Sequence, residues 1–242
     1  MKIEILTLFP EMFKGALDES MLKIAQTKGY VDIEPHNIRK WTYDRHRTAD
    51  DKPFGGGPGM VMKIEPIDAA LAELKGRCEK EKQPIVVLLT PQGKKFDQHF
   101  AQTLSRTGHM ILICGHYEGV DERIRDLVDA EISVGDYILT CGEIPAMVVC
   151  DAVVRLIPGV LGDESSLEEE SFEGGLLEYP QYTRPAEYNG MKVPEVLLCG
   201  DPEKINIWKK EQALKRTERR RPDLMIRKEK LKYEDRRLKA EI

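Results

Sequence analysis

The sequence predicts an α/β fold in which a parallel sheet is covered by helices on both faces. Strand-like and helix-like patterns alternate along residues 1–156, and two apolar runs, Ile85–Leu89 and Met110–Cys114, contain no polar residue. Strands of a parallel sheet are buried on both faces, so they read as continuous hydrophobic runs. The intervening helices make the crossovers that parallel strands require.

The first elements follow this pattern. Ile3–Phe9 is predicted to be a strand, and Pro10 suits the first turn of a helix that continues to about Lys28, where Gly29 ends it. Val31–Pro35 alternates as a second strand would. The turn after the first strand contains no GxGxxG, which argues against an ordinary dinucleotide-binding fold.

The later elements of the first 161 residues alternate in the same way. A helix begins at Glu65, where residues 67, 70, 71 and 74 share one apolar face. Thr90–Gly93 is expected to close the strand Ile85–Leu89 with a turn. Glu131–Val134 is a further strand, and helices are expected over 96–105, 121–128 and 145–156.

Glycines follow several of the predicted strands. They are Gly93, Gly115, Gly119, Gly135 and Gly142. Glycine lets a ligand approach the main chain, and α/β sheets bind ligands beyond the carboxyl ends of their strands. Any one of these glycines is also compatible with a simple turn. Together they indicate a ligand site without identifying the ligand.

Residues 41–60 are too polar and glycine-rich for a regular element. Arg45, His46 and Arg47, with aromatic rings and glycines nearby, suit contacts to phosphates and bases. Long loops in compact domains are usually functional or disordered, so a floppy connector is the alternative. No GKS or GKT follows, which excludes a Walker P-loop.

The overall composition is that of a soluble globular protein. The chain has 242 residues, 41% of them hydrophobic and 33% charged. No apolar run approaches the roughly 18 residues that span a bilayer, and the N-terminus lacks a signal-peptide layout, so we expect a cytoplasmic protein without membrane contact. The cysteines never occur as CxxC, so we expect buried free thiols and assign no metal site. They are Cys78, Cys114, Cys141, Cys150 and Cys199.

Charge divides the chain into an acidic body and a basic C-terminal part. Residues 203–242 hold 15 Lys and Arg against 8 Asp and Glu, a net charge of +7, whereas the whole chain carries −5, so residues 1–202 carry −12. Such asymmetry favours a nucleic-acid contact, and a solvated, salt-bridged helix is the alternative. Residues 162–175 hold six acids and no base and are interpreted as a flexible linker. Residues 176–242 are expected to form a small helical domain with a charged tail over 225–242.

Several long motifs occur in a recognisable order. They are Arg45–Thr48, Pro53–Met60, Thr90–Gly93, Cys114–Arg123, Gly135–Tyr137, Arg155–Gly162, Tyr182–Pro185 and Arg220–Pro222. These motifs resemble those of the bacterial tRNA (guanine-N1)-methyltransferases of the SPOUT superfamily, and the resemblance covers nearly the whole chain. It implies that residues 1–161 form a catalytic domain with a C-terminal trefoil knot, which periodicity alone does not show.

The resemblance also implies a reaction and partners. S-adenosylmethionine would donate a methyl group to N1 of the guanine at position 37, just 3′ of the anticodon, so the anticodon stem-loop of tRNA is the partner. A homodimer would share each active site between its subunits. The cofactor would lie against Leu88, Leu89, Pro91, Gly115, Tyr117, Glu118, Gly119, Val134, Gly135, Asp136, Tyr137, Ile138, Leu139, Gly142 and Pro145. Glu118 would face the ligand's ammonium group.

Two side chains are implied to be catalytic. Guanine N1 carries a proton at neutral pH, so the reaction needs a base. The family has an aspartate where this chain has Glu170, and the extra methylene displaces the carboxylate; misplacement of about an ångström can lower a rate on the order of 100-fold. Glu169 is a neighbouring substitute. Arg155 matches the family's catalytic arginine and would stabilise charge on guanine O6.

The resemblance assigns RNA contacts to the loop and to the C-terminal domain. Arginine contacts and stacking suit an unpaired base of the anticodon loop. Cys141 departs from the family, which usually has glycine there. The residues expected to bind RNA are His46, Asp50, Gly55, Arg184, Arg216 and Arg220.

Two other functions remain as alternatives at this stage. The Glu170 departure motivates a catalytically inactive relative that still binds tRNA. The basic C-terminal part is also compatible with an α/β enzyme that acts on a small molecule.

Overall fold

The computed structural model describes residues 1–162 and 170–226. The chain forms two compact units, Met1–Gly162 and Asp163–Ile242, and each is described by itself. Residues 163–169 of the predicted linker, including Glu169, lie outside the described residues, as does most of the charged tail. No helix in the described ranges is long and apolar enough to cross a membrane.

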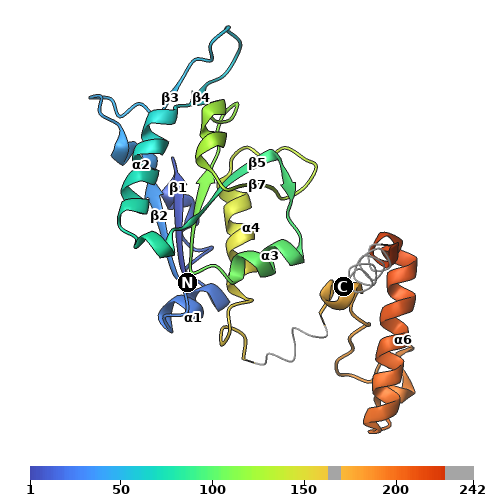
Figure 1. The fold of residues 1–242 in the computed structure, drawn as a ribbon. Coiled ribbons are helices and arrows are strands. Elements are labelled where there is room, and N and C mark those ends of the chain that lie inside the picture. The colour runs from blue at the N-terminus through green and yellow to red at the C-terminus, as the bar shows by residue number, and fades with distance from the viewer. Residues whose placement is uncertain (163–169, 227–242) are drawn as a thin grey trace, which may run out of the picture. The chain divides into compact units, whose positions relative to one another are not determined.

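The first unit is built on a five-stranded parallel sheet in the order β2-β1-β6-β5-β7 (Figure 1). The predicted α/β class with a parallel sheet is therefore confirmed. Each predicted strand is present, with ends shifted by a few residues. The strands are β1 Lys2–Thr7, β2 Asp32–Asn37, β5 Ile85–Lys95, β6 His109–Cys114 and β7 Ala130–Ser133.

Helices cover both faces of this sheet. Figure 1 shows α2 on one side and α3 with α4 on the other. Successive strand residues point to opposite faces. Ile3 and Ile5 accordingly pack into the hydrophobic cluster that includes α1, α3 and α4, and Leu6 packs into the one that includes α2. The helices are α1 Ser20–Thr27, α2 Ile64–Gly76, α3 Gln98–Ser105 and α4 Glu143–Val154; the 3-10 helices are η1 Pro10–Phe13, η2 Ile38–Trp41, η3 Lys80–Lys82 and η4 Glu122–Leu127.

The prediction of one helix from Pro10 to Lys28 was wrong. Pro10 begins only the short η1, after which the chain leaves helical geometry, and α1 starts at Ser20. Gly15 lies in this break with φ +84°, a left-handed conformation that a helix does not contain. The apolar pattern extended across the break because Phe13 and Leu17 are both buried under the sheet.

The prediction that Thr90–Gly93 closes a strand was also wrong. β5 continues to Lys95, and Ile132 of β7 is the register partner of both Leu89 and Lys94. The four intervening residues therefore form a bulge inside the strand pair. A Cβ on Gly93 would lie 2.5 Å from the backbone of Glu131 and Ile132, so only glycine permits this approach.

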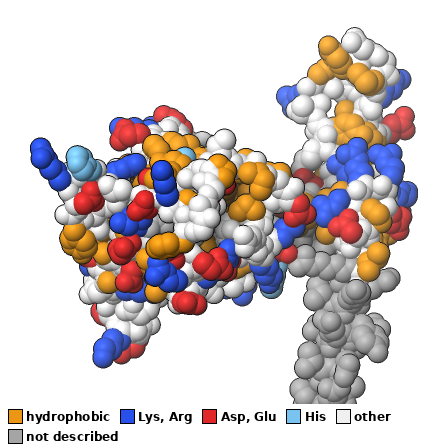
Figure 2. Space-filling view, turned by 90° about the horizontal axis from the view of Figure 1, so that it is seen from above, with side chains coloured by type: hydrophobic (Ala, Val, Ile, Leu, Met, Phe, Trp, Pro, Cys, Tyr) orange, Lys and Arg blue, Asp and Glu red, His pale blue; other side chains and the backbone are white. Residues whose placement is uncertain are grey.

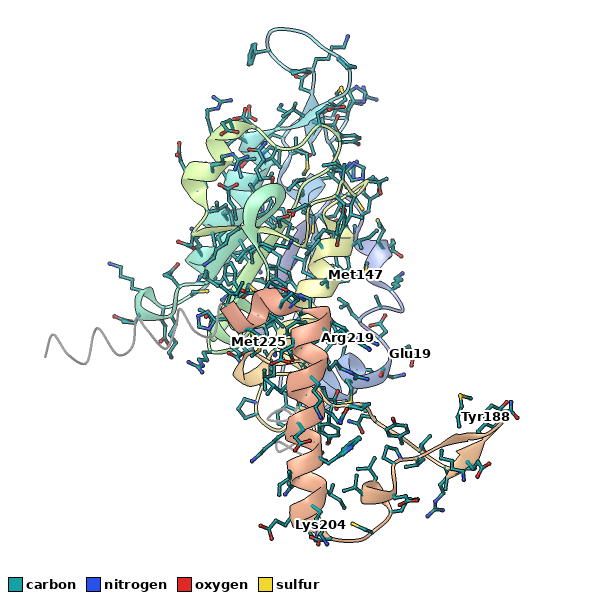
Figure 3. The ribbon with its side chains drawn as sticks, turned by 90° about the vertical axis from the view of Figure 1, so that its right-hand side faces the viewer. Glu19, Met147, Tyr188, Lys204, Arg219 and Met225 are labelled. Carbon is teal, nitrogen blue, oxygen red and sulfur yellow. The ribbon has the colours of Figure 1, made fainter. Side chains whose placement is uncertain are left out.

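The second unit contains one long helix and a small hairpin. The hairpin pairs β8 Glu187–Tyr188 with β9 Met191–Lys192, and Figure 3 shows Tyr188 at its outer tip. Short 3-10 helices occupy η5 Glu173–Gly175 and η6 Glu195–Leu197. The helix α6 spans Pro202–Arg220.

Local interactions explain where α6 begins and what it packs against. The Asp201 side chain accepts hydrogen bonds from the backbone N–H of Glu203 and Lys204, which caps the helix, and Pro202 suits its first position. Near the other end, Thr217 is fully buried, and its hydroxyl accepts a 2.8 Å hydrogen bond from the backbone of Leu177. The helix therefore has an internal contact within its own unit.

All five cysteines are free thiols, as predicted. Their predicted burial is confirmed for Cys114, Cys141 and Cys150 but was wrong for Cys78, which is half-buried, and for Cys199, which is exposed. Burial raises the pKa of Cys150 to about 12, so this thiol is protonated at neutral pH.

Candidate functional site

A cavity of about 560 Å³ lies in the first unit, beside the loops that follow β5, β6 and β7. Its size is typical of small-molecule sites, and its place at the carboxyl ends of parallel strands is where α/β sheets bind ligands. The lining combines main chain, apolar side chains and a few polar groups. The geometry therefore supports the ligand site that the glycine pattern predicted.

Two of the lining loops are joined by their backbones. His116 and Cys141 form an antiparallel β-bridge, and the N–H of Gly142 donates to the carbonyl of Gly115 at 2.7 Å. A Cβ on Gly142 would lie 2.7 Å from both Cα of Cys114 and N of Gly115. Glycine at this position therefore allows the two loops to meet.

The third loop is held by hydrogen bonds of its own. The Ser133 hydroxyl, which is buried at the end of β7, donates to the carbonyl of Gly135 at 3.0 Å, and the N–H of Tyr137 donates to the same carbonyl at 3.0 Å. The loop consequently turns tightly beside the cavity and exposes main-chain groups to it.

The structure gathers the expected cofactor residues around this cavity, with one exception. Asp136 does not line it, because its carboxylate points outward and pairs with Lys95 at 3.3 Å. The sequence analysis also missed ten residues that line the cavity. These residues lie within or close to the quoted motifs, and this closeness could have identified them. The omitted residues are Thr90, Gln92, His116, Val120, Glu122, Arg125, Ile132, Ser133, Thr140 and Cys141.

Charged residues occupy one part of the cavity wall. Arg125 of η4 forms an ion pair with Glu131 and donates a 2.8 Å hydrogen bond to the side-chain oxygen of Gln92. This contact ties η4 to the bulge of β5, so a side chain from one lining loop positions another.

The segment predicted to contact RNA, residues 41–60, is divided by β3 Asp50–Asp51, so the expectation that it contains no regular element was wrong. Residues 42–49 precede β3, and residues 52–60 form the loop that projects between β3 and β4 Val61–Met62 (Figure 1). The Asp44 carboxylate orders the first part of the segment by accepting hydrogen bonds from the backbone of His46 and Thr48 and from the Thr48 hydroxyl. The Thr48 contacts lower the pKa of Asp44. His46 and Gly55 are exposed. These hydrogen bonds argue against the alternative that this part of the segment is a flexible connector without a defined conformation.

The same loop is attached to the cavity. The N–H of Glu118 donates to the carbonyl of Met60 at 3.1 Å, and the N–H of Met62 donates to Gly119 at 3.0 Å. Burial raises the pKa of the cavity residue Tyr117, and the carboxylate of Asp50 beside it raises that pKa further. The C-terminal end of the candidate RNA loop is therefore hydrogen-bonded to a loop that lines the cavity.

The two expected catalytic residues belong to different units. Arg155 follows α4 in the first unit, where its N–H donates to the carbonyl of Asp151 at 3.3 Å. Glu170 is partly buried in the second unit. Among the residues that the structure describes, those that line the cavity belong to the first unit, so neither unit by itself contains the cavity and both side chains.

The remaining expected RNA contacts lie in the second unit. Arg184 and Arg220 are exposed, and Arg216 donates a 3.3 Å hydrogen bond to the carbonyl of Glu178. Figure 2 shows Lys and Arg side chains gathered on this unit. Figure 3 labels Lys204 and Arg219 near opposite ends of α6, and Lys209, Lys210, Lys215 and Arg216 lie between them in the helix.

Comparison with known proteins identifies the family. The family model described as tRNA (Guanine-1)-methyltransferase TrmD matches residues 1–227. The chain belongs to this methyltransferase family. The resemblance found in the sequence is thereby confirmed, and the family implies a methyl donor and a tRNA substrate.

Curated relatives agree with the family match over nearly the whole chain. A protein of Dictyoglomus turgidum, named tRNA (guanine-N(1)-)-methyltransferase, is 56% identical over 242 residues, which cover 100% of this chain and 96% of the relative. A protein of Carboxydothermus hydrogenoformans with the same name is 59% identical over 226 residues, covering 93% of this chain and 87% of the relative. Similarity at this level extends through both units.

Proposed function

We propose that this chain transfers a methyl group from S-adenosylmethionine to N1 of guanine at position 37 of tRNA. The observation that carries the proposal is the cavity at the carboxyl ends of β5, β6 and β7, in a chain of the tRNA (guanine-1)-methyltransferase family. A small-molecule methyl donor suits this cavity, and an exposed loop that is hydrogen-bonded to a cavity loop suits an RNA substrate.

The residues present fit S-adenosylmethionine. A volume of about 560 Å³ is within the range of cavities that hold ligands of this size. Leu88, Leu89 and Ile138 supply apolar walls for an adenine ring, and main-chain groups of the loops supply donors and acceptors for its edge. Glu118 supplies a carboxylate for the ammonium group. When bound, the cofactor supplies an electrophilic methyl group.

The chain's own side chains would prepare the guanine. N1 becomes a nucleophile when its proton is removed, and we assign this step to the carboxylate of Glu170. Negative charge then develops on O6, where the guanidinium of Arg155 would stabilise it. Glutamate in place of the family's aspartate keeps the basic group, although it changes its reach.

We further propose a homodimer with active sites shared between subunits. The assignment of Glu170 and of the cavity to different compact units supports sharing, because neither unit alone carries the complete set of expected residues. Apolar side chains exposed on η1 and α4 support a contact surface, since such patches commonly mark interfaces. They include Met12, Ile144 and Val148.

The bridge between His116 and Cys141 supports a trefoil knot, because it joins the loop after β6 to the loop after β7.

The tRNA anticodon stem-loop would contact both units. The segment carrying His46, Asp50 and Gly55 is attached to a cavity loop at Met60 and Met62, and the second unit offers Arg184, Arg216 and Arg220. We propose that residues 176–242 act as the tRNA-binding domain and residues 162–175 as the linker. We place the reaction in the cytoplasm, where tRNA is available.

The two alternative functions, a catalytically inactive relative and a small-molecule enzyme, are not supported, because the family and its named relatives are tRNA methyltransferases.

Transfer of radiolabelled methyl from S-adenosylmethionine to tRNA tests the function. We expect labelled tRNA and 1-methylguanosine as the labelled nucleoside after digestion. Labelled tRNA with a different methylated nucleoside would refute the assignment to N1, and unlabelled tRNA would refute methyl transfer itself.

A further inference from the structure

Three side chains with metal-binding atoms lie together at the junction of the cavity wall and α4. One ligand atom each from His116, Cys141 and Glu143 lies within 4.8 Å of the other two. His116 and Cys141 line the cavity, whereas Glu143, the first residue of α4, is fully buried. None of the three has a role in the base catalysis described above.

The buried carboxylate of Glu143 has one oxygen that is hydrogen-bonded and, within the described ranges, one that is not. Its Oε1 accepts a 2.6 Å hydrogen bond from the Thr7 hydroxyl, whose oxygen in turn accepts a 2.8 Å bond from the backbone of Phe9. Its Oε2 is buried and has no hydrogen-bond partner among the described residues. A buried carboxylate oxygen without a partner is unfavourable, so this atom points to a missing ligand.

The fold holds the other two side chains in place. The β-bridge between His116 and Cys141 pairs their backbones. The His116 ring lies 4.9 Å from the Phe9 ring and 4.6 Å from the Tyr117 ring, measured between centroids. Two paired cavity loops and the first residue of α4 thus bring the three ligand atoms together.

We propose that His116, Cys141 and Glu143 bind a divalent cation of the zinc class. Thiolate, imidazole and carboxylate are the ligands that zinc prefers in proteins. The metal–sulfur bond forms as the thiol proton leaves to solvent. The thiolate and the Glu143 carboxylate together neutralise the ion's two charges, which a buried site requires. Because two ligands line the cavity, water or a ligand in the cavity supplies the fourth position.

Ligation has one evident structural cost. The N–H of Tyr117 donates to Nδ1 of His116 at 3.0 Å. Ligation through Nδ1 replaces this bond, and ligation through Nε2 moves the ring proton to Nδ1, so the bond is lost in both cases. One ordinary hydrogen bond is small beside the affinity of a thiolate-containing zinc site.

A second group in the described residues, Glu4, Glu34 and His36, lacks these properties. It contains no sulfur. The Glu4 carboxylate already accepts hydrogen bonds from His36 and His109 and pairs with Lys2. The contrast favours the Cys141 group as the cation site.

Titration of the purified full chain with cobalt(II), a spectroscopic substitute for zinc, tests the proposal. We expect a sulfur-to-cobalt charge-transfer absorption that zinc abolishes. Cys141→Ser, and Cys141→Gly as a second variant, should lose the absorption while their thermal unfolding remains cooperative. Glu143→Gln should weaken cobalt binding about tenfold or more. Cys199→Ser, which removes an exposed thiol, is the matched control and should keep the absorption.

Two results would overturn the site. One is the absence of charge-transfer absorption in the wild-type chain. The other is absorption that survives both Cys141 variants or disappears with Cys199→Ser, because the sulfur ligand would then be a different cysteine. Neither result depends on methyl transfer, so failure of this proposal is distinct from failure of the proposed function.

Discussion

The N–H of Gly142 donates to the carbonyl of Gly115 at 2.7 Å, which joins the loop after β6 to the loop before α4. Both residues line the cavity. The approach leaves no room for a side chain, since a Cβ on Gly142 would lie 2.7 Å from two backbone atoms. The shape of the candidate methyl-donor site therefore depends on a backbone contact.

Replacement of Gly142 by alanine tests this dependence. We expect Gly142→Ala to push the loops apart, to lower the free energy of unfolding by about 1–3 kcal/mol, and to weaken S-adenosylmethionine binding. Calorimetric titration and urea unfolding measure the two effects. Gly76→Ala is the control, because a Cβ there meets nothing within 4 Å. Equal cofactor affinity for Gly142→Ala and the wild type would contradict the account.

Stability in acid depends on a carboxylate at the other end of the sheet. Glu4 is 1% exposed, and burial alone would raise its pKa; hydrogen bonds from His36, His109 and Lys2 outweigh burial and lower the pKa to about 2. Because this pKa is depressed from 4.5, the stabilisation is complete above pH 4.5 and is lost as pH falls towards 2. The contribution at neutral pH is about 3 kcal/mol.

Urea unfolding at pH 7 and pH 3 tests this contribution. We expect Glu4→Gln to be much less stable than the wild type at pH 7, whereas at pH 3 the difference should shrink to about 1 kcal/mol. Glu19→Gln alters an exposed carboxylate and serves as the control (Figure 3). A difference between wild type and Glu4→Gln that is the same at both pH values would show that Glu4 does not act through its charge.

The assignment of the base predicts how Glu170 variants behave. Glu170→Gln should lower kcat by about 10²–10⁴-fold with S-adenosylmethionine affinity retained, because a general base contributes on that scale. Glu170→Asp should keep activity, since it restores the family's residue. Glu187→Gln, a change at an exposed carboxylate of the same unit, should have little effect. If Glu170→Gln turns over at the wild-type rate, the base lies elsewhere.

The assignment of Arg155 has its own test. Arg155→Ala should lower kcat with little change in the affinity for S-adenosylmethionine, because the guanidinium is proposed to act on charge that develops during the reaction. Arg106→Ala serves as a control for loss of an arginine elsewhere in the first unit. An equal loss of cofactor affinity and of kcat would instead make Arg155 a structural residue of the site.

The basic second unit predicts a salt-dependent RNA interaction. Arg220→Ala should weaken tRNA binding and reduce the slope of log affinity against log salt by about 1, because one phosphate contact is removed. Binding measured across a salt series gives both values. Lys80→Ala, in η3 of the first unit, is the control and should leave the slope unchanged. An unaltered slope for Arg220→Ala would remove this arginine from the interface.

The sequence predicted the sheet because its signals are local. The apolar runs of β5 and β6 and the alternation of β2 specify buried and half-buried strands without information from elsewhere in the chain. The break at Gly15 was missed because the apolar pattern continues through it on both sides. The bulge at residues 90–93 was missed because it depends on the register with Ile132, which is a contact between strands.

Prediction of the candidate site had a similar limit. The predicted cofactor residues other than Asp136 all line the cavity, but ten further lining residues were missed. Asp136 was included because it lies within the run 134–139, and its pairing with Lys95 is a contact between residues far apart in the sequence. The group formed by His116, Cys141 and Glu143 was missed because its residues do not have the sequence spacing of a known metal-binding motif. They come together only when two loops pair. Cys141 was noted only as a departure from the family.

The most direct test of the central claim compares two tRNA transcripts that differ only at position 37. Incubation with methyl-labelled S-adenosylmethionine, followed by digestion and nucleoside analysis, measures where the methyl group goes. We predict 1-methylguanosine from the transcript with guanine at position 37 and no label in the transcript with adenine there. Equal labelling of both transcripts, or a labelled nucleoside other than 1-methylguanosine, would contradict the account.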